Sequence, residues 1–220
     1  VYHSLAGYTT IRENDEIWRI YQAEGHIYFQ SFTAIYVYNY ETITVVESPF
    51  VMLFLHLANR KFIAQIIDNG LYWFADNKFS FIEGSHIFNQ SKVHSIIPYI
   101  NNTLLIATAN HGLFVFDGKG FENFNSQASD FLKFYTCNAA LRVSDSVFVF
   151  GSILNGLILT DQNGKILMHY NKSNGLRNNT ILSLYKDLDK GLWVGKDDGA
   201  SYIELNSPFT HYTSSGGALG

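Results

Sequence analysis

Two aspartates with the spacing of calcium ligands occur towards the C-terminal end of the sequence, in Asp187-x-Asp189-x-Gly191. An EF-hand loop starts in a similar way, but it needs glycine at its sixth position and a bidentate glutamate at its twelfth. Leu192 and Asp198 stand at those positions here. The motif therefore favours a tight turn, in which aspartate side chains accept hydrogen bonds from nearby backbone N–H groups, and we predict no metal site.

The other residues capable of chemistry do not form a catalytic motif. The chain has eight histidines, but it has no HExxH, no GxSxG elbow and no phosphate-binding glycine loop. Asp197 and Asp198 share one turn, so they are poor candidates for the two carboxylates of a glycoside hydrolase. Cys137 is the one cysteine, which excludes an internal disulfide and a cysteine-based zinc site. We therefore expect no catalytic residue and no cofactor in this chain.

The remaining polar candidates share one feature, which is a place in or beside a short turn between predicted strands. Their amide, carboxylate and guanidinium groups suit hydroxyl-rich or charged sugar ligands. Asparagine and aspartate are also common in turns simply because of their backbone preferences. We predict ligand contacts from Asp68, Asn69, Asn110, His111, Asn155, Arg177, Lys196, Asp197 and Asp198.

These turns belong to a repeated unit, and its most complete copy runs from Asn178 to Tyr212. Thr180–Tyr185 alternates apolar and polar side chains, as a half-buried strand does. Tight turns follow at residues 187–191 and 196–199, and short apolar strands lie between and after them. Four short strands joined by tight turns are typical of one blade of a β-propeller.

Glycines in the second turn of each unit give the period. Gly70, Gly112, Gly156 and Gly199 occupy equivalent places, and their spacing of about 43 residues suits a four-stranded blade. Ala34 takes the same place in an earlier unit. We predict an all-β fold, a β-propeller of about five four-stranded blades at residues 16–47, 50–83, 92–125, 134–171 and 178–212. Residues 126–134 are expected to form a short helix or a long loop between two blades.

This architecture would bring the candidate ligand contacts to one face. In a propeller, the turns between the second and third strands lie on the same face as the connections between blades. The candidates come from these two kinds of segment, with Arg177 in the connection before the last unit. We therefore expect them to form a binding face.

The ends of the chain predict further blades. Tyr2-His3 occupies the place that His211-Tyr212 occupies in the last unit, and the tail 213–220 is rich in glycine and serine. We expect residues 1–15 to be the end of a preceding blade with a linker, and residues 213–220 to be a linker to the next blade. The segment would then be part of a seven- or eight-bladed ring, and a closed five-bladed ring is the alternative.

Composition agrees with strands and excludes some partners. Of the 220 residues, 47% are hydrophobic and 16% are aromatic, and aromatic enrichment favours strands. The net charge of -4 argues against a nucleic-acid partner, which normally requires a basic face.

The sequence contains no apolar run that approaches the about 18 residues of a membrane-spanning helix. No signal peptide is visible at Val1, so a secreted parent would have lost it or had it removed.

The last unit resembles a known repeat. The pattern Asn-x-x-Ile…Asp-x-Asp-x-Gly-Leu-Trp-Val-Gly-x-x-x-Gly in Asn178–Leu205 is similar to the two-component regulator propeller repeat, which builds the periplasmic sensor region of Bacteroides-type hybrid two-component histidine kinases. Lys196 and Ala200 depart from the threonine and leucine usual in that family. Both changes are on the loop side and leave the blade pattern intact.

The resemblance implies a non-catalytic, extracytoplasmic domain of a sensor histidine kinase that detects an oligosaccharide. The parent receptor would be a homodimer in the inner membrane, with this segment in the periplasm and the kinase domain outside it. The segment itself would bind no nucleic acid and would reach the membrane only through other parts of the receptor. Two other classes stay open, a propeller enzyme acting on glycans (hydrolase or lyase) and a protein–protein interaction platform. Trp193 is expected to pack between blades rather than to stack on a sugar.

Overall fold

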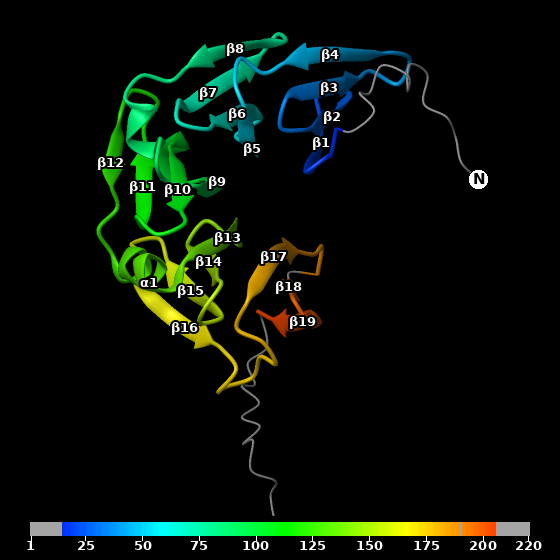
Figure 1. The fold of residues 1–220 in the computed structure, drawn as a ribbon. Coiled ribbons are helices and arrows are strands. Elements are labelled where there is room, and N and C mark those ends of the chain that lie inside the picture. Colours follow the sequence, from blue (N-terminus) through cyan, green and yellow to red (C-terminus); the bar gives the residue numbers. More distant parts are fainter. Residues whose placement is uncertain (1–14, 190, 206–220) are drawn as a thin grey trace, which may run out of the picture. The chain divides into compact units, whose positions relative to one another are not determined.

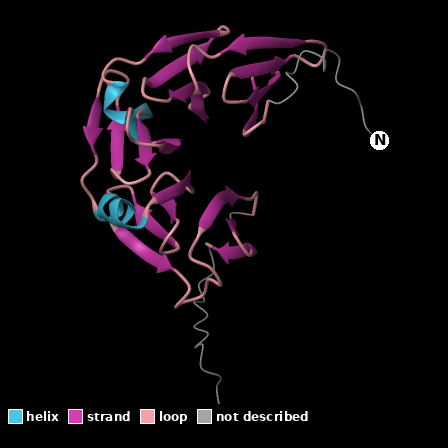
Figure 2. Ribbon diagram, viewed as in Figure 1, coloured by secondary structure: helices cyan, strands magenta, loops and turns pink. Residues whose placement is uncertain are grey.

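Antiparallel sheets of consecutive strands are the main regular structure of the computed structural model, which describes residues 15–189 and 191–205 (Figures 1 and 2). Four sheets have four strands each, and the fifth has three strands within the described residues. Each sheet is a meander, which is the blade of a β-propeller. The predicted fold class, an all-β propeller of five blades, is confirmed.

The chain divides into two compact units, Val1–Lys92 and Val93–Gly220. The first unit contains blades one and two. Blade one consists of β1 (Arg19–Ala23), β2 (His26–Gln30), β3 (Ala34–Tyr38) and β4 (Ile43–Glu47). Blade two consists of β5 (Met52–Ala58), β6 (Lys61–Ile66), β7 (Gly70–Ala75) and β8 (Lys78–Phe81), and a 3₁₀ helix at Ser85–Phe88 follows it.

Blades one and two pack face to face through apolar side chains. Tyr28 and Val37 of blade one meet Phe62 and Phe74 of blade two in one buried cluster. Phe62 pairs with Phe74 across β6 and β7, so both rings lie on the sheet face turned towards blade one. The centroids of the Tyr28 and Phe62 rings are 4.4 Å apart. Offset aromatic contacts of this kind stabilise a core beyond simple area burial.

Two-residue hairpin turns close three of the strand pairs in the first unit. The turns are Glu24–Gly25, Asn59–Arg60 and Asp76–Asn77, and all six residues have positive φ angles, between 48° and 73°. Positive φ at both positions is the requirement of the type I′ turn, whose twist matches that of the flanking strands. These turns gather at one end of blades one and two.

The second unit contains the other three blades. Blade three consists of β9 (Val93–Pro98), β10 (Leu104–Thr108), β11 (Leu113–Phe116) and β12 (Phe121–Asn123), with a 3₁₀ turn at Ile100–Asn102. Blade four consists of β13 (Cys137–Arg142), β14 (Val147–Ser152), β15 (Leu157–Asp161) and β16 (Ile166–Tyr170). Blade five begins with β17 (Ile181–Lys186), β18 (Gly191–Lys196) and β19 (Gly199–Glu204). The predicted strand at 209–212 and the predicted terminal segments at 1–14 and 213–220 lie outside the described residues.

A helix, α1 (Gln127–Tyr135), connects blades three and four. The Ser126 hydroxyl caps it by accepting a hydrogen bond from Ser129 N at 3.1 Å. Ala128 and Leu132 lie in the core shared by blades three and four. Of the two expectations for this segment, the short helix is therefore the observed one.

The second-turn glycines adopt matching conformations at the start of each third strand. Gly70, Gly112, Gly156 and Gly199 all have positive φ, from 71° to 113°. A Cβ atom on Gly70 or Gly112 would approach a serine hydroxyl, of Ser85 or Ser129, to less than 3.0 Å. On Gly156 it would meet the Tyr170 carbonyl, whereas Gly199 has open space around it. Gly70, Gly112 and Gly156 therefore leave space for the end of the last strand of the same blade or for the segment that follows it.

Candidate functional site

The predicted contacts in blades two and three lie in turns, as expected from the repeat. Asp68 and Asn69 are in the turn between β6 and β7, where the Asn69 amide donates to the Ile67 carbonyl at 3.1 Å. Asn110 and His111 are exposed in the turn between β10 and β11. The two pairs belong to different compact units. Contact of either pair with a ligand stays a prediction.

Asn155, in the turn between β14 and β15, is held by neighbouring side chains. Its Oδ1 accepts a hydrogen bond from the Asn171 amide at 3.0 Å. Its backbone carbonyl accepts one from His169 Nε2 at 2.8 Å. These bonds fix the turn, so Asn155 has a clear structural role.

The structure brings together Lys196 and Asp198 of blade five, with Arg177 of the preceding connection near enough for its charge to act on Asp198. Lys196 is only 6% exposed, and its amine donates to Asp198 Oδ1 at 2.9 Å. This hydrogen bond, with the positive charge of Arg177 adding to it, holds the pKa of the Asp198 carboxyl below its ordinary value. Arg177 and Asp197 are exposed. The cluster offers an exposed guanidinium beside a carboxylate that is already paired, which suits a polar ligand.

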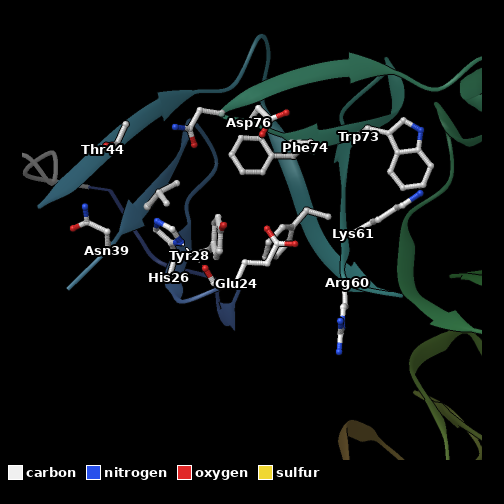
Figure 3. A pocket seen from close by; sticks show the side chains of 14 residues that line it. Glu24, His26, Tyr28, Asn39, Thr44, Arg60, Lys61, Trp73, Phe74 and Asp76 are labelled. Carbon is white, nitrogen blue, oxygen red and sulfur yellow. Dashed lines mark hydrogen bonds between the residues drawn. The ribbon is translucent and has the colours of Figure 1, made fainter. Parts of the chain in front are cut away.

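A cavity that sequence reasoning missed lies at the opposite end of the strands from Asp68 and Asn69. It has a volume of 670 Å³ and lies between the sheets of blades one and two, within the first unit (Figure 3). We call it the blade 1–2 groove. Tyr28, Phe62 and Phe74 line its depth, and the hairpin turns described above contribute to its mouth. The signal in the sequence that could have located this groove is the placing of aromatic residues at alternate positions of neighbouring strands, such as Tyr28, Phe62 and Phe74.

One wall of the blade 1–2 groove carries a row of polar side chains from blade one. His26, Tyr28, Asn39 and Thr44 line the groove. Strand pairing opposes Tyr28 to Val37 and Val37 to Thr44, which puts these residues on the face of blade one turned towards blade two. Tyr28 is 8% exposed. Burial, with the negative charge of Glu24 adding to it, raises the pKa of the Tyr28 hydroxyl above its ordinary value, so it stays protonated and can donate.

The Trp73 ring and the Lys61 amine belong to another surface, although both residues border the groove. The Lys61 amine lies 5.4 Å from the centre of the Trp73 ring, a cation–π distance. Trp73 pairs with Ile63, one position away from the pair of Phe62 and Phe74. Side chains alternate along a strand, so the Trp73 indole is turned away from the depth of the groove (Figure 3).

The aspartate turn of blade five has the role expected of a tight turn. Asp187 Oδ1 accepts from Gly191 N at 2.7 Å, and Asp187 Oδ2 accepts from Trp193 Nε1 at 3.1 Å. Trp193 packs on Tyr202, with ring centroids 5.1 Å apart. It is nevertheless 46% exposed, so the described residues do not bury it between blades as expected.

No three or more His, Cys, Asp and Glu side chains among the described residues are grouped so that they could hold a metal ion. Nor does this part of the chain contain a helix with the length and apolar character needed to cross a membrane.

No protein-family model matches the sequence, and no curated protein matches it either. Among solved structures, the extracellular domain of a one component system from B. thetaiotaomicron aligns with a TM-score of 0.68 and 16% identity, over 89% of this chain and 28% of that one. Inactive virginiamycin B lyase from Staphylococcus aureus with quinupristin gives a TM-score of 0.68 and 10% identity, over 92% and 71%. The WD40 propeller domain of Doa1 gives 0.63 and 12%, over 87% and 66%.

These similarities establish the fold alone. The three proteins include a lyase and an extracellular domain of a signalling system, and their identities to this chain are 10% to 16%. Propellers host many unrelated functions. The chain spans 28% of the length of the extracellular domain from B. thetaiotaomicron. Function must therefore be argued from the residues themselves.

Proposed function

We propose that the chain is a non-catalytic, extracytoplasmic ligand-sensing segment of a two-component sensor histidine kinase. The observation that carries this proposal is the sequence of Asn178–Leu205, which resembles the two-component regulator propeller repeat. The alignment of 89% of the chain with the extracellular domain from B. thetaiotaomicron agrees with it at the level of the fold. The proposed location is the periplasm, with the membrane anchor and the kinase supplied by other parts of a homodimeric receptor.

The proposed ligand is an oligosaccharide. The nine turn residues predicted above are candidates for contact with it, and the exposed guanidinium of Arg177 beside Asp198 is the best placed of them. Guanidinium, carboxylate and amide groups all bind sugar hydroxyls through directional hydrogen bonds.

A sensor of this kind needs no chemistry on its ligand. The oligosaccharide has only to bind one arrangement of the receptor dimer more tightly than another. An affinity difference of about tenfold, or about 1.4 kcal/mol, already shifts a two-state equilibrium measurably.

Isothermal titration of the complete ectodomain against a glycan panel tests the proposal. Binding with the sugar recovered unchanged is the expected result. Release of cleaved products would instead favour a glycan-acting propeller enzyme, a class for which the similarity to a lyase is the supporting observation. Absence of glycan binding, with specific capture of a periplasmic protein, would favour the interaction platform.

A further inference from the structure

We infer that the blade 1–2 groove is a saccharide-binding site, additional to the turn residues proposed above. This inference rests on the proposed function, because it names a place where the sensed saccharide binds. The groove volume of 670 Å³ lies within the range of about 300–1,000 Å³ that is usual for small-molecule sites. The volume of the groove does not indicate which class of ligand it binds, but the polar side chains that line it do.

The Tyr28 hydroxyl is the first of these groups. The residue is 92% buried, since 8% of its surface is exposed, and it lines the groove (Figure 3). Within the described residues, no protein group is hydrogen-bonded to the Tyr28 hydroxyl, and its oxygen is not one of the buried side-chain atoms that lack a partner. The oxygen is therefore open to the groove that the residue lines. A ligand hydroxyl there could both donate to it and accept from it.

His26 and Asn39 continue the polar wall on one side of Tyr28 (Figure 3), and each has one group already engaged. His26 Nδ1 donates to the Glu24 carbonyl at 2.9 Å, which leaves Nε2 as the ring nitrogen available to a ligand. Asn39 Oδ1 accepts from the backbone N–H groups of Glu41 and Thr42, at 2.9 Å and 2.7 Å. The Asn39 amide NH₂ is therefore the group left to donate into the groove. A hydroxyl, a ring nitrogen and an amide donor along one wall match the neighbouring hydroxyls of a sugar ring, each of which can donate and accept.

The mouth of the groove favours a ligand without net charge. Glu24 and Asp76 contribute two carboxylates and Arg60 contributes a cation, whereas the Lys61 amine lies over the Trp73 ring. Both signs are present, so a strongly anionic or cationic ligand would meet like charge as well as opposite charge at the mouth. The apolar depth, formed by aromatic rings, suits the C–H face of a pyranose ring. Together with the polar wall, these features point to a neutral saccharide.

Titration of the full chain with four neutral sugars (maltotriose, cellotriose, xylotriose and N-acetylchitotriose) at millimolar concentration tests the inference. Tyr28→Phe removes only the hydroxyl, and Asn39→Asp keeps Oδ1 in its turn but removes the NH₂ donor. We expect each variant to raise the dissociation constant of the bound sugar at least about fivefold. Tyr38→Phe is the matched control, because the Tyr38 hydroxyl binds the Tyr40 carbonyl on the surface, and it should leave the dissociation constant unchanged.

Three outcomes would overturn the inference. If a sugar binds but Tyr28→Phe and Asn39→Asp bind it as tightly as the unmodified chain, the groove is not its site. If Arg177→Ala alone abolishes binding under the same conditions, the proposed function stands and the groove inference fails. If none of the four sugars binds, both fail for neutral saccharides. Circular dichroism and thermal melting of each variant confirm that lost affinity is not lost fold.

Discussion

Serine and glycine act together at the start of the third strand in blades two and three. Leu71 N donates to Ser85 Oγ at 2.9 Å, and Leu113 N donates to Ser129 Oγ at 3.0 Å. The serine can approach only because glycine precedes each leucine. The repeat spacing predicted these glycines, but the serines lie in the segments between blades, where the sequence shows no repeated pattern.

Alanine at Gly112 should be far more damaging than alanine at Gly199. Both residues have positive φ, which costs a residue with a Cβ about 1–2 kcal/mol. Only at Gly112 would the new Cβ also displace Ser129, leaving the buried Leu113 N–H without its acceptor at a further cost of about 1–3 kcal/mol. We expect Gly112→Ala to lower the free energy of unfolding by about 2–5 kcal/mol and Gly199→Ala by about 1–2 kcal/mol. Equal losses in urea denaturation would contradict this.

The buried amine of Lys196 makes Asp198 important for stability. We expect Asp198→Asn to lower the melting temperature at neutral pH, because a buried ammonium then loses its counter-charge. Lys196→Met should have a smaller effect, since replacing a buried charge by an apolar side chain of similar size is often neutral. A larger loss for Lys196→Met than for Asp198→Asn would refute this account.

The pH dependence of the same pair has a defined sign. The pKa of Asp198 is lower in the folded chain than its ordinary value of 3.8. Its contribution to stability is therefore fully present above that ordinary value and is lost as the pH falls through the folded pKa. The unmodified chain and Asp198→Asn should differ in melting temperature at neutral pH and should converge in acid. A difference that persists at the lowest pH of a thermal-melt series would show that charge is not the cause.

At the scale of elements, α1 joins two blades by its buried face and carries charged side chains on its exposed face. Ala128 and Leu132 enter the core, Ser129 binds the first residue of β11, and Asp130 and Lys133 form an exposed ion pair at 3.3 Å. A nine-residue helix is too short to show a sustained helical period. For this reason the sequence predicted only a helix or a loop here, although it predicted the strands on either side.

Ser129→Ala should separate the structural role of α1 from its exposed charges. The substitution leaves the buried Leu113 N–H without an acceptor, so we expect a loss of about 1–3 kcal/mol in the free energy of unfolding. Lys133→Ala removes one half of an exposed ion pair and should cost no more than about 1 kcal/mol. Chemical denaturation of both variants measures the difference, and a smaller loss for Ser129→Ala than for Lys133→Ala would disprove it.

At the scale of the whole molecule, the period of the glycines predicted the number and order of the blades but not the groove. The repeat pattern is a property of the sequence of each unit by itself, whereas a groove is formed by the way in which two sheets pack against one another. Tyr28 and Phe74 look like ordinary strand residues, and Glu24 and Asp76 like ordinary turn residues. Their meeting in one cavity follows from three-dimensional packing. The burial of Lys196 could not be predicted from the sequence either, because a lysine followed by Asp197 and Asp198 is typical of an exposed, charged turn.

The rate at which Cys137 is alkylated would report how often the second unit opens to solvent. Cys137 is buried in the core of blades three and four, and burial raises the pKa of its thiol from 9.0 to about 12. Because only the thiolate is nucleophilic, iodoacetamide should modify the native chain only when this unit opens. An exposed control, Ser146→Cys in a Cys137→Ala background, should react at the rate of a short peptide. Equal rates for the two thiols would contradict the burial of Cys137.

The same thiol should weaken the fold in alkali. Its pKa is higher in the folded chain than in the unfolded one, so its contribution to stability is complete below about pH 9 and declines as the pH rises towards about 12. Cys137→Ala should remove this alkaline component of the melting curve.

The meander order of every described sheet, in which each strand pairs with its sequence neighbour, bears on how the chain comes to fold. Pairing sequential strands closes loops of only a few residues, so little loop-closure entropy opposes it. Contact order within a blade is correspondingly low, unlike that of Greek-key sandwiches, and low contact order accompanies fast folding. During synthesis, a blade can form its own hairpins as soon as its last strand leaves the ribosome. We therefore expect the docking of one finished blade on the next to be slower than hairpin formation within a blade.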